Sequence, residues 1–188
     1  MTEFRPYARI LASGAAITST LLLATACDES GNPTPVTTTN TAPAATSGAS
    51  TAFDPCAALT QQFLAEHQWD ARAPERKQTT TGGVVWQGCA YLAQTRYSFT
   101  VQTTNGTLAQ VHEKFPSATA TTINGRKALR YQARPDMPGG CTVNVEMTSG
   151  SLYILVDDPR AAHPRKLSPC DNATEIAEAV VPLLPAGS

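Results

Sequence analysis

Residues 118–134, ATATTINGRKALRYQAR, decide the fold class of this chain. Two runs of strand-forming residues flank the dipeptide Asn124-Gly125. Asn-Gly suits both positive-φ positions of a type I′ turn, which joins antiparallel strands through a two-residue loop. The stretch therefore predicts a β-hairpin, and with it an antiparallel sheet.

Four further stretches have strand character. Residues 84–91 form one expected strand, with Gly88 as a candidate β-bulge. Residues 96–103 and 141–147 alternate apolar and polar side chains, whereas residues 152–156 are apolar at every position and indicate a central strand. Together with the hairpin, these stretches predict about six strands.

Helices are expected before, between and after these strands. Asp54 is a candidate N-cap at the start of the first, and residues 105–115 carry apolar side chains at helical spacing. The last helix is expected to begin at Asp171 or Asn172, with Glu175 as a capping-box partner. This order predicts an α+β fold with a mainly antiparallel sheet, helices at both ends and one between strands.

Residues 1–26 are expected to be a signal peptide. An uncharged stretch follows Arg9, is shorter than a membrane-spanning helix, and ends in small residues before Cys27. This ending resembles a bacterial lipobox, although Ala24 stands where Leu is commonly preferred. We expect a lipid anchor on Cys27 that holds the chain at the extracytoplasmic face of the cell membrane. The alternative is an ordinary signal peptide cut after Ala26, with Cys27 a free thiol.

Residues 27–52 are expected to form the lipidated cysteine and a disordered tether. Residues 28–52 are rich in Thr, Ala, Pro, Ser and Gly, and Val36 is their only larger aliphatic residue. Such a segment cannot bury enough apolar surface to offset the entropy lost on ordering. A single globular domain is expected over residues 53–188.

Four cysteines follow Cys27, namely Cys56, Cys89, Cys141 and Cys170. An even number in an exported chain indicates two disulfides, for which three pairings are possible. We favour the sequential pairs, each of which closes a loop of about 30 residues and stabilises the fold by roughly 3–4 kcal/mol. A zinc site is the alternative, but the chain has no Cys-x-x-Cys and no histidine at ligand spacing.

Several of these features together resemble an actinobacterial lipoprotein family that is catalogued only as a domain of unknown function. They are the Cys27 segment, the Pro/Thr-rich tether, the opening Phe53-Asp54-Pro55-Cys56-Ala57-Ala58-Leu59-Thr60, and Cys89-Ala90-Tyr91. Tyr91 stands where Trp is common in that family. The resemblance implies an envelope location, two disulfides and an α+β fold, and it assigns no catalytic residue.

Net charge argues against nucleic acid as a partner. Residues 53–188 contain 12 Lys and Arg residues and 12 Asp and Glu residues. Nucleic-acid-binding domains generally carry a basic surface. The expected partners are instead the membrane, through the lipid on Cys27, and an envelope protein or anionic envelope ligand.

No catalytic residue, metal site or cofactor is expected. The domain has no Gly-x-Ser-x-Gly and no Ser-x-x-Lys, and His67, His112 and His163 lie in separate expected elements. Asp157 and Asp158 could bind a hard cation, but they lack further oxygen ligands nearby, and a capped loop start is the simpler interpretation.

Three arginines form the candidate site for an anionic ligand. Strand periodicity places Arg126, Arg130 and Arg134 on one face with Ala128, opposite to Tyr131. Guanidinium groups in a row could bind phosphate or carboxylate groups. The alternative is a solvated sheet face with cross-strand partners such as Glu146.

Two functions follow from these expectations. The first is a non-catalytic module that binds a ligand or a protein in the cell envelope, and the second is a small envelope hydrolase or transferase with an unrecognised site. A purely structural role in the envelope is a third. The lack of a nucleophile next to a base favours the binding module.

Overall fold

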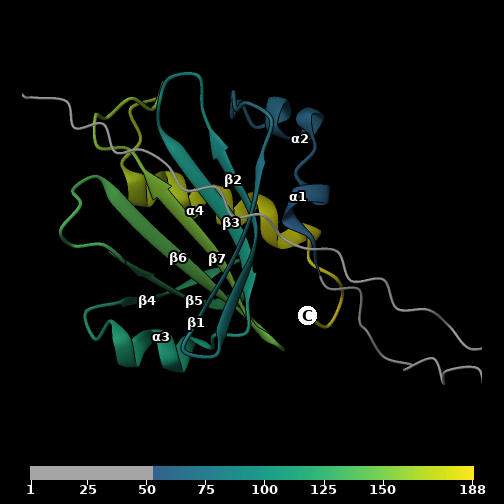
Figure 1. Ribbon diagram of the computed structural model, residues 1–188, viewed down its shortest axis with the longest axis vertical. Coiled ribbons are helices and arrows are strands. Elements are labelled where there is room, and N and C mark those ends of the chain that lie inside the picture. Colours follow the sequence, from purple (N-terminus) through teal and green to yellow (C-terminus); the bar gives the residue numbers. More distant parts are fainter. Residues whose placement is uncertain (1–52) are drawn as a thin grey trace, which may run out of the picture. The chain divides into compact units, whose positions relative to one another are not determined.

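The computed structural model describes residues 53–188, and the expected signal peptide, Cys27 and tether lie outside the described residues. One seven-stranded sheet dominates this part of the chain, in the order β1-β2-β3-β7-β6-β5-β4, with every neighbouring pair antiparallel (Figure 1). The strands are β1 (Glu75–Thr81), β2 (Val84–Leu92), β3 (Ser98–Thr104), β4 (Thr119–Ile123), β5 (Arg126–Tyr131), β6 (Gly140–Met147) and β7 (Gly150–Asp157). The predicted α+β class and antiparallel sheet are confirmed.

Four α-helices and one 3₁₀ turn complete the described chain. They are α1 (Pro55–Ala58), α2 (Gln61–Glu66), α3 (Leu108–Lys114), α4 (Pro169–Val180) and η1 (Val181–Leu183). Among the residues described, no helix is both long and apolar enough to cross a membrane.

The hairpin between β4 and β5 is confirmed. Asn124 and Gly125 have φ values of 47° and 82°, so both central residues of the turn are left-handed. Ile123 pairs with Arg126 across the turn, which sets the register of the two strands.

The strand count of about six was too low, because β1 was not expected. Every residue of β1 is exposed, and its sequence ERKQTTT shows no apolar alternation. The strand exists because its backbone pairs with β2 at the edge of the sheet, through a turn in which Gly82 and Gly83 have positive φ. An edge strand without a buried face gives no periodic signal.

Gly88 is not a bulge, since it pairs in continuous register with Lys77 on one side and Gln102 on the other. A Cβ atom at Gly88 would lie 2.2 Å from the carbonyl oxygen of Val101. The glycine therefore permits close approach of β2 and β3.

Two helix starts differ from their predicted positions. Helix α3 begins after the N-cap Thr107 rather than at residue 105, because the Asn105 side chain instead bonds backbone groups of Gly83 and Val85. Helix α4 begins after the N-cap Ser168, whose hydroxyl accepts from the backbone N–H of Asp171.

The sheet has one face that is sealed by helices, which we call the α4 face. Strand pairing places its core side chains in register, and they pack with buried residues of α1, α2 and α4. These include Phe99, Val101, Val143, Val145, Ile154 and Val156. Burying each such side chain contributes about 1.5–3 kcal/mol.

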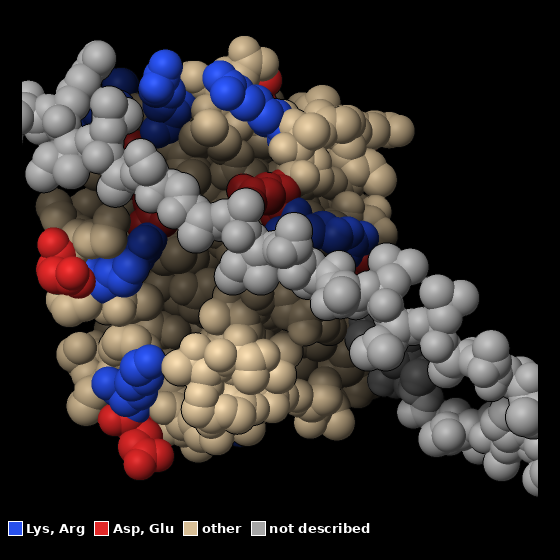
Figure 2. Space-filling view, viewed as in Figure 1, with Lys and Arg blue, Asp and Glu red and all other residues tan. Residues whose placement is uncertain are grey.

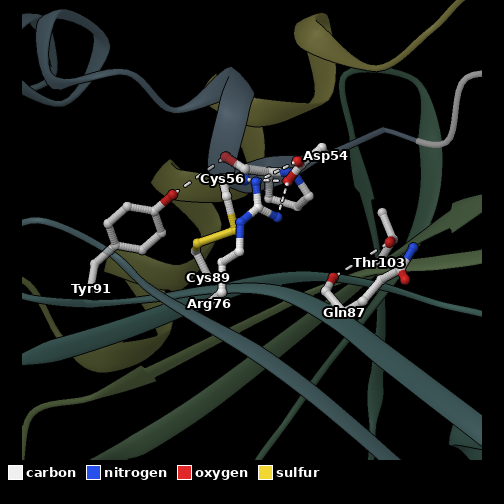
Figure 3. Close-up of a disulfide and its surroundings, with 8 residues drawn as sticks. Asp54, Cys56, Arg76, Gln87, Cys89, Tyr91 and Thr103 are labelled. Atoms are coloured by element: carbon white, nitrogen blue, oxygen red, sulfur yellow. Dashed lines mark hydrogen bonds and ion pairs between the residues drawn. A yellow bond between two sulfur atoms is a disulfide. The ribbon is translucent and has the colours of Figure 1, made fainter.

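Two disulfides attach helices to the α4 face, and both sequential pairings are confirmed. Cys56 of α1 bonds Cys89 of β2 with Cα atoms 5.3 Å apart (Figure 3). Cys170 of α4 bonds Cys141 of β6 with Cα atoms 5.0 Å apart. Each bond joins a helix to the strand that it covers.

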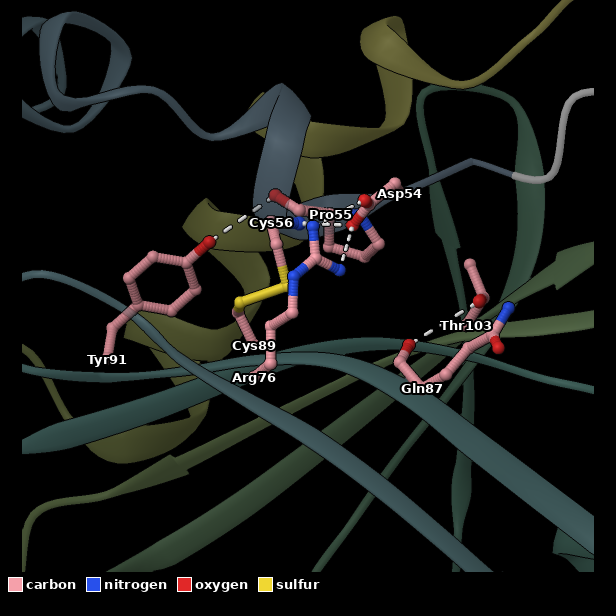
Figure 4. A network of polar contacts seen from close by, with 8 residues as sticks. All are labelled: Asp54, Pro55, Cys56, Arg76, Gln87, Cys89, Tyr91 and Thr103. Carbon is pink, nitrogen blue, oxygen red and sulfur yellow. Dashed lines mark hydrogen bonds and ion pairs between the residues drawn. A yellow bond between two sulfur atoms is a disulfide. The ribbon is translucent and has the colours of Figure 1, made fainter.

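The predicted cap at Asp54 is confirmed and is part of a wider contact (Figure 4). The Asp54 carboxylate accepts from the backbone N–H of Cys56 at 2.9 Å and from the Arg76 guanidinium of β1 at 2.8 Å. The hydrogen bond from Arg76 holds the pKa of Asp54 below its usual value. The Tyr91 hydroxyl also donates to the carbonyl of Pro55 at 3.3 Å. These contacts position the start of the domain over β1 and β2.

Candidate functional site: the cleft between α3 and the sheet

The opposite side of the sheet, which we call the α3 face, contains the candidate site. Helix α3 crosses only part of this face and leaves a cleft of about 420 Å³ beside it. Ligand sites commonly measure about 300–1,000 Å³. The cleft is lined by four aromatic residues, Trp86, Phe115, Tyr131 and Tyr153, together with aliphatic and polar residues and one lysine, Lys114.

The residues at and just before the N-terminus of α3 determine where along the chain the helix begins. Thr107 and Gln110 form a capping box, in which each side chain accepts from the other residue's backbone N–H. The preceding Gly106 donates its N–H to the Thr104 hydroxyl at 3.0 Å. A Cβ atom at Gly106 would lie 3.2 Å from Val84, so a small residue is favoured where the chain leaves β3.

Helix α3 rests lightly on the sheet. None of its residues is fully buried. Its Val111 side chain and the following Phe115 line the cleft, and the Phe115 ring packs against Tyr131 with centroids 4.5 Å apart. The helix is therefore one wall of the cleft rather than a sealed part of the core.

A chain of buried hydrogen bonds underlies the cleft. The Tyr131 hydroxyl donates to Asn144 Oδ1 at 2.8 Å, Asn144 Nδ2 donates to the Ser151 hydroxyl at 2.7 Å, and that hydroxyl donates to the Gly106 carbonyl at 2.8 Å. Asn144 is 1% exposed and Ser151 is 0% exposed. Because these groups satisfy one another, the polar floor of the cleft is preorganised.

The floor of the cleft is uncharged. Burial raises the pKa of Tyr131 well above its usual value, and burial also raises the pKa of Tyr153. Both phenols are therefore neutral hydroxyl groups at neutral pH. The one charged residue among those lining the cleft is Lys114, whose ammonium lies 5.5 Å from the centroid of the Phe115 ring.

The three arginines that the sequence singled out are not brought together as expected. Arg126 and Arg130 share a face with Ala128, as predicted, but this is the α4 face. Strand β5 ends at Tyr131, so strand periodicity does not extend to Arg134 and that part of the expectation is wrong. Anion binding by this set stays a prediction.

Two of these arginines are engaged within the protein. Arg126 donates to the carbonyl oxygens of Glu146 and Ser188, and Arg134 forms an ion pair with Asp157. Glu146 contributes its backbone carbonyl rather than its carboxylate, because the pairing brings that carbonyl within 3.3 Å of Arg126.

Asp158 caps a loop. Its carboxylate accepts from the backbone N–H groups of Ala162 and His163 at 2.6 and 2.9 Å. Over the described part of the chain, no three His, Cys, Asp or Glu side chains are grouped to hold a metal ion.

The histidines lie apart from one another. His67 ends α2 and stacks on Trp69 with ring centroids 4.9 Å apart, and His112 is exposed on α3. His163 is 2% exposed and lies against Tyr97, with ring centroids 5.0 Å apart. Burial lowers the pKa of His163.

Sequence reasoning did not find the cleft. The sequence signal for the cleft was a set of aromatic residues at strand positions that face away from the α4-face core, such as Trp86, Tyr131 and Tyr153. Their grouping depends on sheet order, which joins β2 to β5 through three intervening strands.

Comparison with known proteins gives one match. Residues 22–183 match a family described as "Protein of unknown function (DUF3558)". No curated protein and no solved structure matches the chain.

Proposed function

The chain belongs to the DUF3558 family of proteins of unknown function, and from this premise we propose that it is a lipid-anchored ligand-binding module of the cell envelope, without catalytic activity. The cleft beside α3 is its binding site. The observation that carries the proposal is a partly apolar cleft of about 420 Å³ with a preorganised, uncharged floor.

The anchored location is supported by sequence. The stretch before Cys27 resembles a lipobox, and the tether-like composition that follows suits a domain displayed at a membrane surface. The family match begins at residue 22, so the family pattern includes the Cys27 segment. We propose on this basis an extracytoplasmic lipoprotein of actinobacterial type with lipid on Cys27.

The chemistry of the cleft suits binding better than catalysis. The Ser151 hydroxyl is fully buried beneath the floor, and its proton is directed to the Gly106 carbonyl. Its other neighbour, Asn144, is an amide and cannot accept that proton as a base. Burial raises the pKa of Tyr131, so its phenol is even harder to deprotonate than an ordinary tyrosine. A hydrolase or transferase would need a base that these groups do not supply.

The lining indicates the class of ligand. Aromatic side chains favour a flat or extended apolar body, and the Thr104 hydroxyl, which accepts from the Gly106 N–H, can still donate its own proton at the floor. Lys114 at the lining favours one anionic group. We therefore propose a small amphipathic ligand that is neutral or carries a single negative charge.

A fluorescent probe of this chemistry tests the proposal. The probe 1-anilinonaphthalene-8-sulfonate has an apolar body and one anionic group, and its emission rises in apolar surroundings. Val111→Phe places a ring in the cleft and should weaken probe binding by about tenfold, the effect of roughly 1.4 kcal/mol. Equal binding by the native protein and this variant would contradict the proposed site.

His112→Phe is the matched control. It adds a ring at the next position of the same helix, where the side chain is exposed and does not line the cleft. This variant should bind the probe like the native protein. Serine- and cysteine-reactive activity probes should not label the protein specifically, whereas an envelope hydrolase acting through such a nucleophile would be captured.

A further inference from the structure

A second hollow, which shares no lining residue with the α3 cleft, is lined by three arginines. It measures about 230 Å³, and its lining consists of Arg72, Leu92, Ala93, Arg96 and Arg160. The arginines come from three separate segments, before β1, between β2 and β3, and after β7. Figure 2 shows basic side chains at the upper end of the view, the end where the loop between β2 and β3 lies in Figure 1.

Backbone contacts fix two of these arginines next to each other. The N–H of Arg72 donates to the carbonyl of Leu92 at 3.0 Å, beside a bridge between Ala71 and Ala93. The N–H of Arg96 donates to the Ala93 carbonyl at 2.9 Å, within the tight turn that joins β2 to β3. The two guanidinium groups therefore start from rigid, neighbouring backbone.

The nearby carboxylates are engaged elsewhere. Asp70 accepts from the Gln94 amide at 2.9 Å, Asp157 pairs with Arg134, and Asp158 accepts from two backbone N–H groups. Among the described residues, no ion pair involves Arg72, Arg96 or Arg160. Three guanidinium groups thus line one hollow, and no carboxylate among the described residues lies within 4.0 Å of them.

Like charges held close together repel one another, and an anion in the hollow would remove that repulsion. A guanidinium group presents a planar fork of N–H donors that matches phosphate and carboxylate oxygens. A carboxylate has only two oxygens, whereas a tetrahedral phosphate can accept from three guanidinium groups at once. The number of arginines therefore favours phosphate.

Leu92 indicates what adjoins the phosphate. It is 44% exposed, although it is a large apolar residue, and it lines the same hollow. An apolar side chain beside three guanidinium groups fits a phosphate ester that carries an apolar part.

We propose that Arg72, Arg96 and Arg160 form a phosphate-binding site that is separate from the α3 cleft. The phosphate belongs either to a phospholipid headgroup or to a small soluble phosphate compound. The site does not depend on the proposed role of the cleft.

The test uses the full chain with Cys27→Ser, so that no lipid anchor contributes to binding. In one arm, co-sedimentation is measured with vesicles of phosphatidylglycerol and of phosphatidylcholine. In the other arm, inorganic phosphate is titrated calorimetrically, with acetate at the same ionic strength as the carboxylate control. Binding in the vesicle arm alone, with a preference for phosphatidylglycerol, assigns the site to a membrane surface, and binding of inorganic phosphate assigns it to a soluble compound.

The variants identify the residues. Arg160→Gln, in a loop, should weaken binding by about tenfold, and Gln at all three positions should weaken it by more than about a hundredfold. Lys at the three positions should restore only part of the affinity, because it keeps the charge but loses the planar fork. The matched control, Gln at Lys77, Lys127 and Lys166, removes the same charge at exposed positions that do not line the hollow, and it should leave binding unchanged.

Four results would overturn the proposal. They are no binding in either arm, equal binding of acetate and phosphate, full affinity in the Arg160→Gln and triple variants, and an equal loss in the control set. Because Arg72, Arg96 and Arg160 are all exposed, thermal unfolding should show the variants to be folded.

Discussion

The two faces of the sheet are built from alternate residues of the same strands, yet they differ in almost every physical property. On the α4 face, apolar side chains pack against helices that two disulfides hold in place. On the α3 face, aromatic and polar side chains surround a cleft under a helix with no fully buried residue. Stability is concentrated on one face, which leaves the other free to bind.

The two helices that cover these faces also differ in how firmly they are attached to the sheet. Helix α4 buries Ile176 and Val180 completely and is bonded to β6 through Cys170. Helix α3 is held on the sheet by the Ser151–Gly106 hydrogen bond before its start and by the Phe115–Tyr131 ring contact at its end. A weakly packed helix can shift to admit a ligand at little cost in global stability.

The largest contrast is expected from truncating one apolar residue on each helix. Ile176→Ala should lower the free energy of unfolding by about 2–5 kcal/mol, because it leaves a cavity in the core. Val111→Ala should lower it by less than about 1 kcal/mol, since Val111 lies at an open cleft. Urea denaturation measures both free energies. A similar loss in the two variants would show that α3 packs on the sheet as firmly as α4 does.

Removing a disulfide should have the next largest effect. Replacing Cys141 and Cys170 together by Ser should lower the free energy of unfolding by about 3 kcal/mol, because the unfolded chain is then no longer restricted by a closed loop of about 30 residues. Binding of the fluorescent probe should persist while the variant is folded, as the cleft lies on the other face. If probe binding is lost in the folded variant, the two faces are not independent.

A smaller difference is expected in the response to acid. His163 is buried, so its pKa is lowered in the folded protein, and below about pH 6.5 the unfolded chain binds the proton more readily. Stability should therefore decline as pH falls below that value. His163→Gln should flatten the decline, and His112→Gln, an exposed position on α3, should leave it unchanged. Parallel pH profiles for the native protein and His163→Gln would exclude this role.

Local chemistry explains what the sequence predicted correctly. Asn124-Gly125 specifies its turn through the φ values of two residues. Asp54 caps α1 by accepting a hydrogen bond from the backbone N–H of Cys56, only two residues away. The even set of cysteines limited the disulfides to three pairings, and the sequential one is observed. Such features depend on near neighbours, so they are visible in a linear sequence.

The features that were missed depend on distant parts of the chain. Strand β1 takes its conformation from β2, and the cleft forms only where sheet order brings Trp86 near Tyr131. The start of α4 is an exception, because Ser168 before Pro169 at the first helical position is a local signal that was overlooked in favour of Asp171 or Asn172. Arg72, Arg96 and Arg160 share no periodicity, so no pattern in the sequence could group them.

Photo-crosslinking in living cells tests directly whether the α3 cleft binds a small molecule. An aliphatic diazirine amino acid, which is small enough to leave the cleft open, is placed at position 111, inside the cleft, or at position 112, on the exposed side of the same helix. We expect a small-molecule adduct, seen as a defined mass increase, at position 111 and none at position 112. Equal labelling at the two positions, or no adduct at position 111, would contradict the assignment of the α3 cleft as the ligand site.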